Sequence, residues 1–384
     1  MSKYYTFDCG CKFEITGSNS EFPRIQFEPK LEKINLECSK TWDLISSGNT
    51  KGCFQLESRL GQSMAKKLKP RNIEQLSALI SILRPGCLEA VRDGKTVSNH
   101  YIDKKNGQES VDYYHPILKN VLEKTYGEMI YQEQAMEISR VVSGFNLQEA
   151  DVLRKAIGKK KADLMAEVKK SFLEGAKKVN EVDEETAEEI FGWIEKSQRY
   201  SFNKSHAVSY AMNAYLSAFT KAHFPRVFFA SYLKFAKDKI DPQQEIKELV
   251  RNANEMDINI QTPDIRNLNE LFAIKDRKIF FGLTDIKGLG KSVYKKILEI
   301  LEKDKIDISS LSWYDMLNKV LCKINTTATK ALISCGALDY FKMSRTKMLF
   351  EYEIFNTLTK KEMEKCQEAI SNTDNNLKVI LTEL

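Results

Sequence analysis

The sequence predicts a mainly α-helical protein with a small β-rich segment at its N-terminus. Apolar residues recur at helical spacing through most of the chain from about residue 38 onward. In residues 1–37, aromatic and polar side chains alternate instead, which is typical of short strands and turns. The same alternation returns at residues 273–283, so strands are expected to be a minor component.

The expected helices follow one another along the chain. A capped helix begins near Trp42, and an apolar helix over residues 73–83 ends at Arg84-Pro85-Gly86, because proline and glycine both terminate helices. Residues 92–116 are polar and contain several turn-forming residues, which predicts a long loop. Further helices are predicted over residues 117–123, 130–142, 147–157, 162–179, 184–197, 205–223 and 241–256.

The last third of the chain is expected to change character. Residues 257–272 are irregular and polar, and the strand-like stretch follows them. A glycine-rich hairpin over residues 286–291 opens a helix over residues 292–301, and a second helical pair spans about residues 309–341. The tail beyond Glu362 is charged and is predicted to fray.

Bulk composition excludes several classes of protein. The chain has 384 residues, enough for two or three domains, and its hydrophobic content of 42% is ordinary for a soluble globular protein. It has no run of about 18 apolar residues, and its first residues lack the apolar core of a signal peptide, so neither a membrane span nor secretion is expected. The eight scattered cysteines indicate reduced thiols in the cytoplasm.

Four of these cysteines leave an alternative open. Cys9, Cys11, Cys38 and Cys53 could hold zinc in a small ribbon. The usual two-residue spacer between ligands is absent, so reduced thiols are the preferred interpretation and no metal site is assigned to this chain.

The net charge of +6 is mild, but cations are concentrated locally. Residues 154–178 carry nine Lys or Arg against three Asp or Glu. Such an excess is typical of surfaces that bind polyphosphate or nucleic acid. For a charge run taken alone, a solvated helical face is the preferred explanation.

The most informative stretch lies where the helix over residues 205–223 is expected to begin. Asn203, Lys204, Ser205 and His206 place an amide, an ammonium, a hydroxyl and an imidazole in consecutive positions. Backbone amides at a helix start carry partial positive charge and Lys204 adds a full charge, so a triphosphate is the predicted ligand. Alternatively, Asn203 or Ser205 is only an N-cap and His206 is a surface residue.

Other polar groups are candidates for the same site. Tyr210 projects from the same helix face as His206, and it either stacks on a base or joins the core. Arg84 is held by a tight bend, and Gln132 is either a ligand or solvent-facing. A cationic cluster consists of Arg154, Lys155, Lys159, Lys160 and Lys161. In the functional interpretation, the arginine binds phosphate through two N–H groups and the lysines act as point charges. In the alternative, the cations only stabilise the C-terminus of a helix, which Gly158 is expected to break.

The hairpin at Lys287, Gly288, Gly290 and Lys291 is a separate candidate. Its two glycines let backbone amides approach a phosphate closely, and lysines flank them. The arrangement resembles a helix-hairpin-helix element, which holds duplex backbone without reading sequence. The alternative is a plain turn between two helices.

Several long motifs together resemble the alpha subunit of bacterial DNA polymerase III, the C-family of replicative polymerases. They occur in the family's order within about residues 38–345. The motifs are Gly52-Cys-Phe-Gln-Leu-Glu-Ser58, Leu83-Arg-Pro-Gly86, Tyr126-Gly-Glu-Met-Ile-Tyr-Gln-Glu-Gln134, Ala150-Asp-Val-Leu-Arg-Lys-Ala-Ile-Gly-Lys-Lys160, Phe202-Asn-Lys-Ser-His-Ala207, Phe281-Gly-Leu-Thr-Asp-Ile-Lys-Gly-Leu-Gly290 and Ala331-Leu-Ile-Ser-Cys-Gly-Ala-Leu-Asp339.

The resemblance implies a domain plan and a set of site residues. Residues 38–272 would be a fingers-like domain for the dNTP and template, and residues 273–345 a tandem helix-hairpin-helix region for the duplex. Residues 1–37 would be a ribbon or extension, and residues 346–384 a charged helical tail. The implied nucleotide-binding residues are Arg84, Gln132, Arg154, Lys155, Lys159, Asn203, Lys204, Ser205, His206 and Tyr210. The implied DNA-binding residues are Lys160, Lys161, Lys287, Gly288, Gly290 and Lys291.

The sequence departs from the family in one important respect. The palm, whose three aspartates hold two magnesium ions, normally precedes the motif at Gly52–Ser58, but the residues before that motif here do not resemble a palm. Neither a P-loop nor an Asp-x-Asp strand is found, so no catalytic residue is assigned. We therefore expect a split polymerase, in which this chain binds dNTP and primer-template DNA and a palm-containing chain holds Mg²⁺. The alternatives are a non-catalytic DNA-binding module or a remnant fragment of a polymerase.

Overall fold

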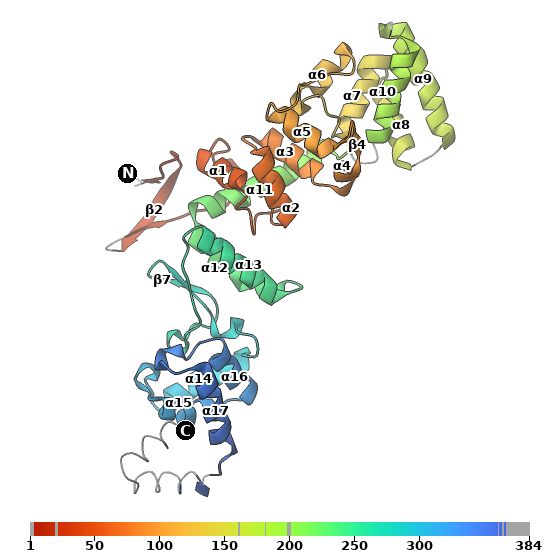
Figure 1. The fold of residues 1–384 in the computed structure, drawn as a ribbon. Coiled ribbons are helices and arrows are strands. Elements are labelled where there is room, and N and C mark those ends of the chain that lie inside the picture. The colour runs from red at the N-terminus through yellow and green to blue at the C-terminus, as the bar shows by residue number, and fades with distance from the viewer. Residues whose placement is uncertain are drawn as a thin grey trace. The chain divides into compact units, whose positions relative to one another are not determined.

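The computed structural model describes residues 4–19, 22–159, 162–180, 182–197, 201–359, 361–362 and 365. Its backbone divides into two compact units, residues 1–224 and residues 225–384 (Figure 1). Helices dominate the described residues and the sheets among them are small, which confirms the predicted fold class. Within the described ranges, no helix is long and apolar enough to span a bilayer.

The N-terminal residues form a small antiparallel ribbon. Its strand order is β1-β2-β3, and Tyr5 pairs with Phe13 where β1 meets β2. Phe13 is buried, whereas Tyr5 is exposed, so one face of the ribbon contributes to a core. The strands are β1 (Tyr4–Thr6), β2 (Lys12–Asn19) and β3 (Phe22–Ile25).

The next helices of the first unit pack around α11. This long helix contacts α3 and α1 because one of its faces carries small side chains that let neighbouring helices approach closely. The buried small residues on α11 are Ala207, Ala211, Ala214, Ala218 and Ala222. The helices of this layer are α1 (Ser39–Ser47), α2 (Arg59–Leu68), α3 (Ile73–Ile82) and α11 (Lys204–His223).

A buried lysine ties the loop between α1 and α2 to α11. The side chain of Lys221 is fully buried, and its Nζ donates hydrogen bonds to the backbone carbonyls of Asn49 (2.8 Å) and Lys51 (2.7 Å). One helical turn earlier, the Ser217 hydroxyl accepts a hydrogen bond from the Phe54 backbone N–H at 3.0 Å. These contacts fix the motif at residues 52–58 against α11.

The segment after α3 differs from the prediction. Pro85 occupies the first turn of a new helix rather than only ending the previous one, and Arg84 is the extended residue before it. The long loop predicted over residues 92–116 is also wrong, because a hairpin and a helix occupy much of it. The elements are α4 (Pro85–Glu89), β4 (Val91–Arg92), β5 (Lys95–Thr96) and α5 (Val97–Lys105).

The polar composition of α5 led to the prediction of a loop, but several of its polar side chains are buried against acidic partners. Lys104 is 6% exposed, and its Nζ lies 3.1 Å from the carboxylate of the buried Glu128. His100 is also buried, and its Nδ1 lies 2.7 Å from Glu109. Because each buried charge has a partner, the helix tolerates polar residues that a periodicity argument assigns to solvent.

The remaining helices of the first unit share one apolar core. Leu122, Ile138, Leu153, Phe172 and Ile190 all belong to it. The helix expected to break at Gly158 continues to Lys159, so that part of the prediction is wrong. The helices are α6 (Lys119–Leu122), α7 (Gln132–Ser143), α8 (Leu147–Lys159), α9 (Ala162–Asn180) and α10 (Glu184–Ser197).

The second unit begins with a helix that the sequence analysis did not anticipate. Pro225 is the first residue of α12 (Pro225–Phe235), because proline is well suited to the first turn, where its missing N–H is not needed. α12 packs against α13 (Pro242–Glu255) and a three-stranded sheet of order β6-β8-β7. The strands are β6 (Ile260–Gln261), β7 (Ala273–Lys275) and β8 (Lys278–Phe280).

The C-terminal helices of the second unit enclose a separate core. Leu289, Ile297, Met316, Leu332 and Met348 are among its buried residues. The helices are α14 (Lys291–Lys303), α15 (Trp313–Lys319), α16 (Thr326–Ser334) and α17 (Arg345–Thr357). The tail expected to fray lies outside the described residues beyond Glu362, apart from Lys365.

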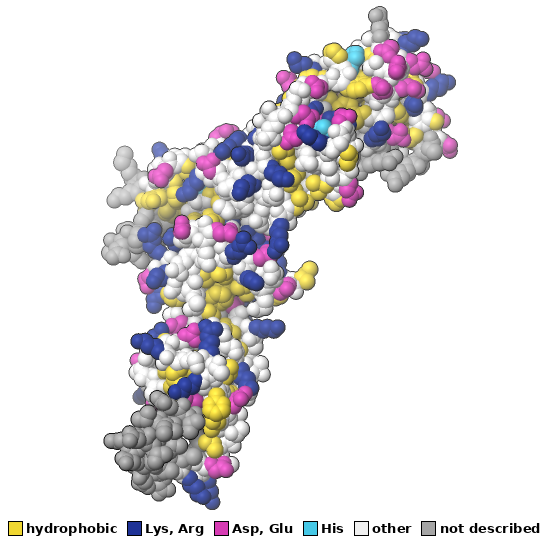
Figure 2. Space-filling model, viewed as in Figure 1, with side chains coloured by type: hydrophobic (Ala, Val, Ile, Leu, Met, Phe, Trp, Pro, Cys, Tyr) yellow, Lys and Arg dark blue, Asp and Glu magenta, His cyan; other side chains and the backbone are white. Residues whose placement is uncertain are grey.

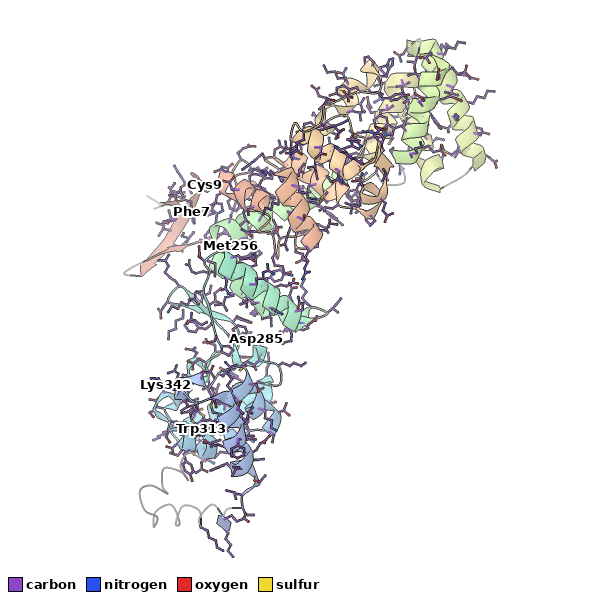
Figure 3. All side chains as sticks on the ribbon, in the orientation of Figure 1. Phe7, Cys9, Met256, Asp285, Trp313 and Lys342 are labelled. Atoms are coloured by element: carbon purple, nitrogen blue, oxygen red, sulfur yellow. The ribbon has the colours of Figure 1, made fainter. Side chains whose placement is uncertain are left out.

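Asp285, labelled in Figure 3, gives the second unit a pH dependence. Burial raises the pKa of Asp285 to about 6, although the Phe272 backbone N–H donates to its carboxylate at 3.0 Å and opposes the shift. The folded pKa therefore exceeds the unfolded value of about 3.9. This group's contribution to stability is complete below the unfolded pKa and is lost as the pH rises through about 6.

We predict that Asp285→Asn removes this loss of stability between acidic and neutral pH. Urea unfolding of the full chain, with pulsed hydrogen exchange read on peptides from α14, measures the second unit's stability at each pH. The exposed Asp238→Asn serves as a control and is expected to keep the wild-type slope. An unchanged pH slope in Asp285→Asn would contradict the assignment.

Candidate nucleotide and DNA site

Two distant segments of the first unit are joined at the start of α11. Tyr131 and Phe202 form a parallel β-bridge. The Phe202 backbone N–H donates to the Ile130 carbonyl at 3.0 Å, and the Gln132 N–H donates to the Phe202 carbonyl at 3.0 Å. The start of α7 is therefore fixed beside the start of α11.

Asn203 is the N-cap of α11, as one of the alternatives predicted. Its Oδ1 accepts hydrogen bonds from the His206 backbone N–H (3.0 Å), from Ser205 Oγ (2.6 Å) and from His206 Nδ1 (3.0 Å). Glu133 of α7 accepts from Asn203 Nδ2 at 2.8 Å and from the Lys204 backbone N–H at 2.9 Å. Two of the backbone donors expected to face a phosphate are thus already engaged, so side-chain cations have to provide most of any anion affinity.

Lys204 is held in place by a carboxylate and an aromatic ring. Its Nζ lies 2.9 Å from Glu74 Oε1 and 5.4 Å from the centroid of the Tyr131 ring. Tyr131 is buried, and burial raises the pKa of its phenol, so the ring stays neutral beside the ammonium. The pair with Glu74 is roughly two-fifths exposed, and exposed ion pairs contribute little to stability.

Arg84 stacks on Phe202. Its guanidinium carbon lies 3.6 Å from the centroid of the Phe202 ring. Arg84 is exposed, and among the described residues it has no acidic partner. Stacking fixes the plane of the guanidinium but leaves its N–H groups available, which is the arrangement that suits bidentate binding of a phosphate.

Aromatic rings extend from Phe202 along α11. The Phe202 ring centroid lies 6.3 Å from the His206 ring and 6.4 Å from the Tyr210 ring. Tyr210 in turn meets Phe54 edge-on at 5.4 Å. Tyr210 is half-buried and Phe54 is exposed, so this row of rings borders solvent and can receive a planar ligand.

The cations of α8 have a different environment. Arg154 donates two hydrogen bonds to Asp151 Oδ1, at 2.9 and 2.8 Å, and Lys155 lies 2.7 Å from Asp151 Oδ2. These two cations hold the pKa of the Asp151 carboxyl below its usual range. In the described part of the chain, Arg154 and Lys204 pair with different acids, Asp151 and Glu74 respectively.

Chain connectivity nevertheless brings the end of α8 back toward the start of α7. The loop between the two helices is only three residues long, the helices pack against each other, and they are similar in length. The Lys159 side chain is not described, and Lys160 and Lys161 lie outside the described residues.

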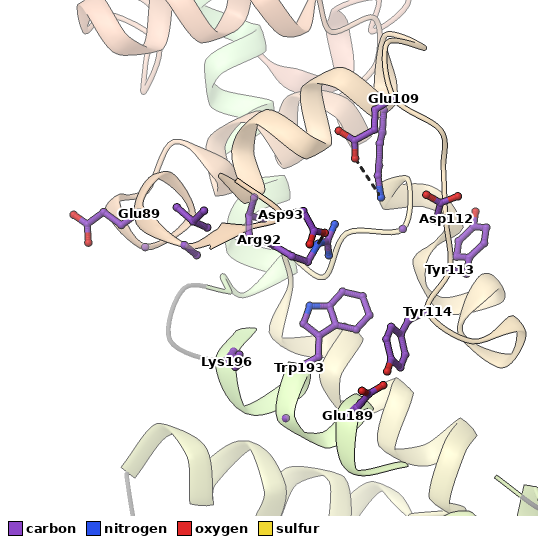
Figure 4. A pocket seen from close by; sticks show the side chains of 17 residues that line it. Glu89, Arg92, Asp93, Glu109, Asp112, Tyr113, Tyr114, Glu189, Trp193 and Lys196 are labelled. Carbon is purple, nitrogen blue, oxygen red and sulfur yellow. Dashed lines mark ion pairs between the residues drawn. The ribbon is translucent and has the colours of Figure 1, made fainter. Parts of the chain in front are cut away.

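The first unit also contains an open cavity of about 1110 Å³ (Figure 4). Arg92 and Trp193 lie inside it, with the guanidinium carbon 6.0 Å from the indole ring, and Arg92 pairs with the buried Glu128 at 2.6 Å. Its lining includes Gly86 and both acidic and basic side chains, but none of the described residues predicted to bind nucleotide. The cavity is therefore separate from the cluster around Phe202, which consists of Phe202, Arg84, Tyr131, Lys204, His206 and Tyr210.

The glycine-rich hairpin of the second unit exposes its backbone. Gly288 has a φ of +96°, which disfavours other residues, and Gly290 is the N-cap of α14. Leu289 between them is buried and anchors the turn, while Lys287 is exposed and Lys291 lies 3.5 Å from Glu270. Lys and Arg are interspersed with Asp and Glu over the face drawn in Figure 2, so surface charge there does not by itself mark a binding face.

The described residues do not assemble a magnesium site. Within the described ranges, one group of three or more potential metal ligands is found. It consists of three thiols and an imidazole and contains no carboxylate. Magnesium requires oxygen ligands, usually carboxylates together with phosphate oxygens. The group that phosphoryl transfer needs therefore does not fit the described part of this chain.

Three residues that build the cluster were not among the predicted site residues. Phe202 is the platform for Arg84, Glu133 ties α7 to α11, and Glu74 holds Lys204. Phe202 and Glu133 each adjoin a predicted site residue, so their positions were a usable signal. Glu74 lies 130 residues from Lys204, and no local pattern connects the two.

Comparison with known proteins supports the resemblance seen in the motifs. Residues 19–180 match the model of the bacterial DNA polymerase III alpha subunit finger domain, and residues 257–348 match a helix-hairpin-helix motif. The chain is 40% identical over 319 residues to the DNA polymerase III subunit alpha of Aquifex aeolicus. It is 36% identical over 328 residues to that of Thermus aquaticus and 34% identical over 351 residues to that of Borreliella burgdorferi.

These three matches cover 83%, 84% and 91% of this chain, and 26%, 26% and 28% of the respective relatives. The chain thus spans about a quarter of the length of the curated relatives it matches. The predicted resemblance to the finger and helix-hairpin-helix region of these subunits is confirmed.

Asn203→Asp tests the junction between α7 and α11. The substitution keeps the capping oxygen but places a second carboxylate where Asn203 Nδ2 now donates to Glu133. We predict a loss of about 1–3 kcal/mol in the free energy of unfolding at neutral pH, because two carboxylates then face each other. The loss shrinks as the pH falls and one carboxyl takes up a proton.

Urea unfolding at neutral and acidic pH measures this effect. Asn203→Ser is the matched control, since serine also caps helices but carries no charge. A loss of stability in Asn203→Asp that does not depend on pH would contradict the described contact with Glu133.

Proposed function

We propose that this chain, which is similar to the finger and helix-hairpin-helix parts of DNA polymerase III alpha subunits, supplies those parts to a C-family replicative DNA polymerase. A second polypeptide supplies the palm with its metal-binding aspartates. In this proposal residues 38–272 bind the incoming dNTP and the template, and residues 273–345 hold the primer-template duplex. Residues 1–37 precede the fingers as a ribbon or extension, and most of the tail predicted over residues 346–384 lies outside the described residues.

One observation carries the nucleotide assignment. Arg84, Gln132 and Lys204 come from three distant segments, and each contacts either Phe202 or a residue bridged to it. The Arg84 guanidinium on the Phe202 ring and the Lys204 ammonium beside the ring of the bridged Tyr131 match the needs of a nucleotide, which is a polyanion attached to a planar base. A purely structural junction would not require a stacked guanidinium with free N–H groups.

The site residues take distinct roles in this proposal. Arg84 binds a phosphate through two N–H groups, and Lys204 adds a point charge after leaving Glu74. His206, once protonated, donates from Nε2 to a phosphate oxygen while its Nδ1 stays bonded to Asn203, and Tyr210 faces the base or sugar. Arg154 and Lys155 are held by Asp151 until the triphosphate provides a stronger acceptor. Gln132 contacts the nucleotide with its amide, while Asn203 and Ser205 hold the first turn of α11 in place.

The hairpin of the second unit takes the duplex. The backbone amides around Gly288 and Gly290 bind a phosphate, and Lys287 and Lys291 neutralise neighbouring phosphates. Such contacts carry no sequence information, as a replicative enzyme requires. The cations at Lys159, Lys160 and Lys161 are assigned to the triphosphate or the adjacent DNA backbone on the strength of the family motif.

The divalent metal ions that phosphoryl transfer requires are assigned to the partner polypeptide. Metal ions of that kind neutralise the developing charge on the triphosphate, and aspartates hold them. Because the described residues gather no carboxylate cluster, they support a division of labour between fingers and palm.

Primer extension tests the proposal as a whole. The full chain, a palm-containing polymerase polypeptide from the same source and a mixture of the two are assayed on the same primed template with Mg²⁺. Extension by the mixture alone is the expected result. Extension by this chain alone would overturn the assignment of the palm to a partner, and an inactive mixture would favour a non-catalytic DNA-binding module.

Arg84→Ala should affect nucleotide use more than DNA binding. Loss of a charge-assisted hydrogen bond of roughly 1.5–3 kcal/mol raises the KM for dNTP in the reconstituted enzyme by about tenfold or more, with the duplex Kd nearly unchanged. The KM of Arg84→Lys for dNTP should lie between those of the wild type and Arg84→Ala, since lysine keeps the charge but not the planar guanidinium. Steady-state extension kinetics and fluorescence anisotropy supply the two readouts.

Arg140→Ala is the control, because Arg140 is an exposed arginine of α7 that pairs only with Glu137 among the described residues. It should leave both readouts at wild-type values. Equal effects of Arg84→Ala on dNTP use and on duplex affinity would contradict the proposed role.

The double variant Lys287→Ala with Lys291→Ala tests the hairpin. Each lost phosphate contact reduces the slope of log K against log salt by roughly 0.9, so the slope should fall by about two. Lys303→Ala with Lys305→Ala, at the opposite end of α14, is the matched control and should keep the slope. Similar slopes for the two double variants would exclude the hairpin as the duplex contact.

A further inference from the structure

Four potential metal ligands from three segments gather at the C-terminal end of α11. They are Cys9, Cys11, Cys38 and His223, and their ligand atoms all lie within 4.8 Å of one another. His223 Nε2 lies 3.3 Å from Cys9 Sγ and 3.7 Å from Cys38 Sγ. Cys9 is half-buried and the other three are buried. All four belong to the first unit.

The spacing of these atoms suits one tetrahedral ion. With Zn–S near 2.3 Å and Zn–N near 2.0–2.1 Å, a regular tetrahedron places two sulfurs about 3.8 Å apart and a sulfur and a nitrogen about 3.6 Å apart. The two distances from His223 Nε2, 3.3 and 3.7 Å, lie on either side of the sulfur–nitrogen value. Since all four ligand atoms lie within 4.8 Å of one another, side-chain movements of about 1 Å or less would close the group around an ion.

The turn between β1 and β2 presents two of the thiols together. The Phe7 backbone N–H donates to the Cys11 carbonyl at 2.9 Å, and the Gly10 N–H donates to the Phe7 carbonyl at 2.8 Å. Gly10 has a φ of +81°, so the chain reverses direction tightly between Cys9 and Cys11. Phe7 and Cys9 lie at this end of the ribbon (Figure 3). Cys38 comes from another segment, where it is the N-cap residue of α1.

His223 is oriented to offer Nε2. Its Nδ1 lies 3.0 Å from the Phe219 carbonyl, and since a carbonyl only accepts, Nδ1 carries the hydrogen and the Nε2 lone pair faces the sulfurs. The imidazole also packs 4.1 Å from the Phe219 ring and 5.0 Å from the Phe7 ring. A backbone carbonyl that fixes the tautomer of a histidine is the usual support of a metal ligand.

We propose that Cys9, Cys11, Cys38 and His223 bind one structural Zn²⁺ ion. Three thiolates and one imidazole are a ligand set of structural zinc sites, and four protein ligands leave no open position for chemistry. Cys53, the fourth candidate from the sequence, does not join the group, and His223 takes that place.

The proposed site is independent of the nucleotide assignment and lies partly outside the matched finger domain. Cys9 and Cys11 precede the matched residues 19–180, and His223 follows them. The ion would fasten the N-terminal ribbon to the last turn of α11, whose first turn carries the cluster around Phe202. Zinc thereby replaces part of the apolar core that so small a ribbon cannot build by itself.

Metal analysis of the full chain tests the site. The chain is expressed with zinc in the medium and purified under reducing conditions, and its metal content is measured by inductively coupled plasma mass spectrometry. One zinc per chain is expected. His223→Ala should lower zinc affinity by about tenfold or more in competition with a chromogenic chelator, whereas His223→Cys should retain the ion.

Cys322→Ser and His115→Gln are controls, because both residues lie outside the group and should leave the zinc content unchanged. Cobalt substitution of the wild-type chain gives a second readout that needs no variant to fold: thiolate-to-cobalt charge transfer and tetrahedral ligand-field bands are expected. A wild-type chain without metal under these conditions, cobalt spectra without thiolate bands, or full zinc retention in His223→Ala would each overturn the proposal.

Discussion

The position of α11 relative to α7 is the constraint on which the candidate site depends. A single parallel bridge between Tyr131 and Phe202 aligns the two segments, and the Glu133 carboxylate closes the first turn of α11. The bridge sets the relative direction of the two segments, and the carboxylate complements the partial positive charge at the N-terminus of α11. Together they align Phe202, whose ring carries the Arg84 guanidinium, with Tyr131. The Lys204 ammonium lies beside the Tyr131 ring, so cations from segments far apart in the sequence meet at this junction.

When no ligand is bound, carboxylates pair with several of the cations predicted to bind nucleotide. Glu74 pairs with Lys204, and Asp151 pairs with both Arg154 and Lys155. These pairs are substantially exposed, so each is weak and can be exchanged for a phosphate at small cost. Arg84 differs because stacking on Phe202, not an ion pair, defines its orientation. In the proposed function, Arg84 is therefore the preorganised cation, and the triphosphate recruits the others.

The sequence carried enough information for the helices and the cationic motifs but not for their partners. Helical periodicity identified α7 to α10, and Asn203 was recognisable as a cap because its side chain acts on residues three positions away. Residues 92–116 were misassigned because Lys104 and His100 are buried through pairing with acids that lie farther along the chain. Pro85 was taken as a terminator and the helix that begins at Pro225 was not predicted, although proline is common in the first turn of helices.

Contacts between residues far apart in the sequence could not be predicted, because local patterns report only on near neighbours in the chain. No spacing rule connects Cys9 with His223 across 214 positions, or Lys204 with Glu74 across 130. Such pairs form only when helices such as α11 and α3 pack, and the buried alanines that permit this packing look like ordinary helix formers in sequence. The family motifs indicated that several residues of the cluster around Phe202 lie close together. The group of cysteines and a histidine had no comparable motif.

Photoaffinity labelling tests the central claim most directly. The full chain, its palm-containing partner and a primer-template are incubated with a dNTP analogue that carries a photoreactive group on its γ-phosphate, irradiated, and mapped by peptide mass spectrometry. The account predicts labelling of peptides that contain Arg84 and residues 202–206, and competition by unmodified dNTP. Labelling confined to the hairpin at residues 287–291, or labelling that unmodified dNTP does not suppress, would contradict it.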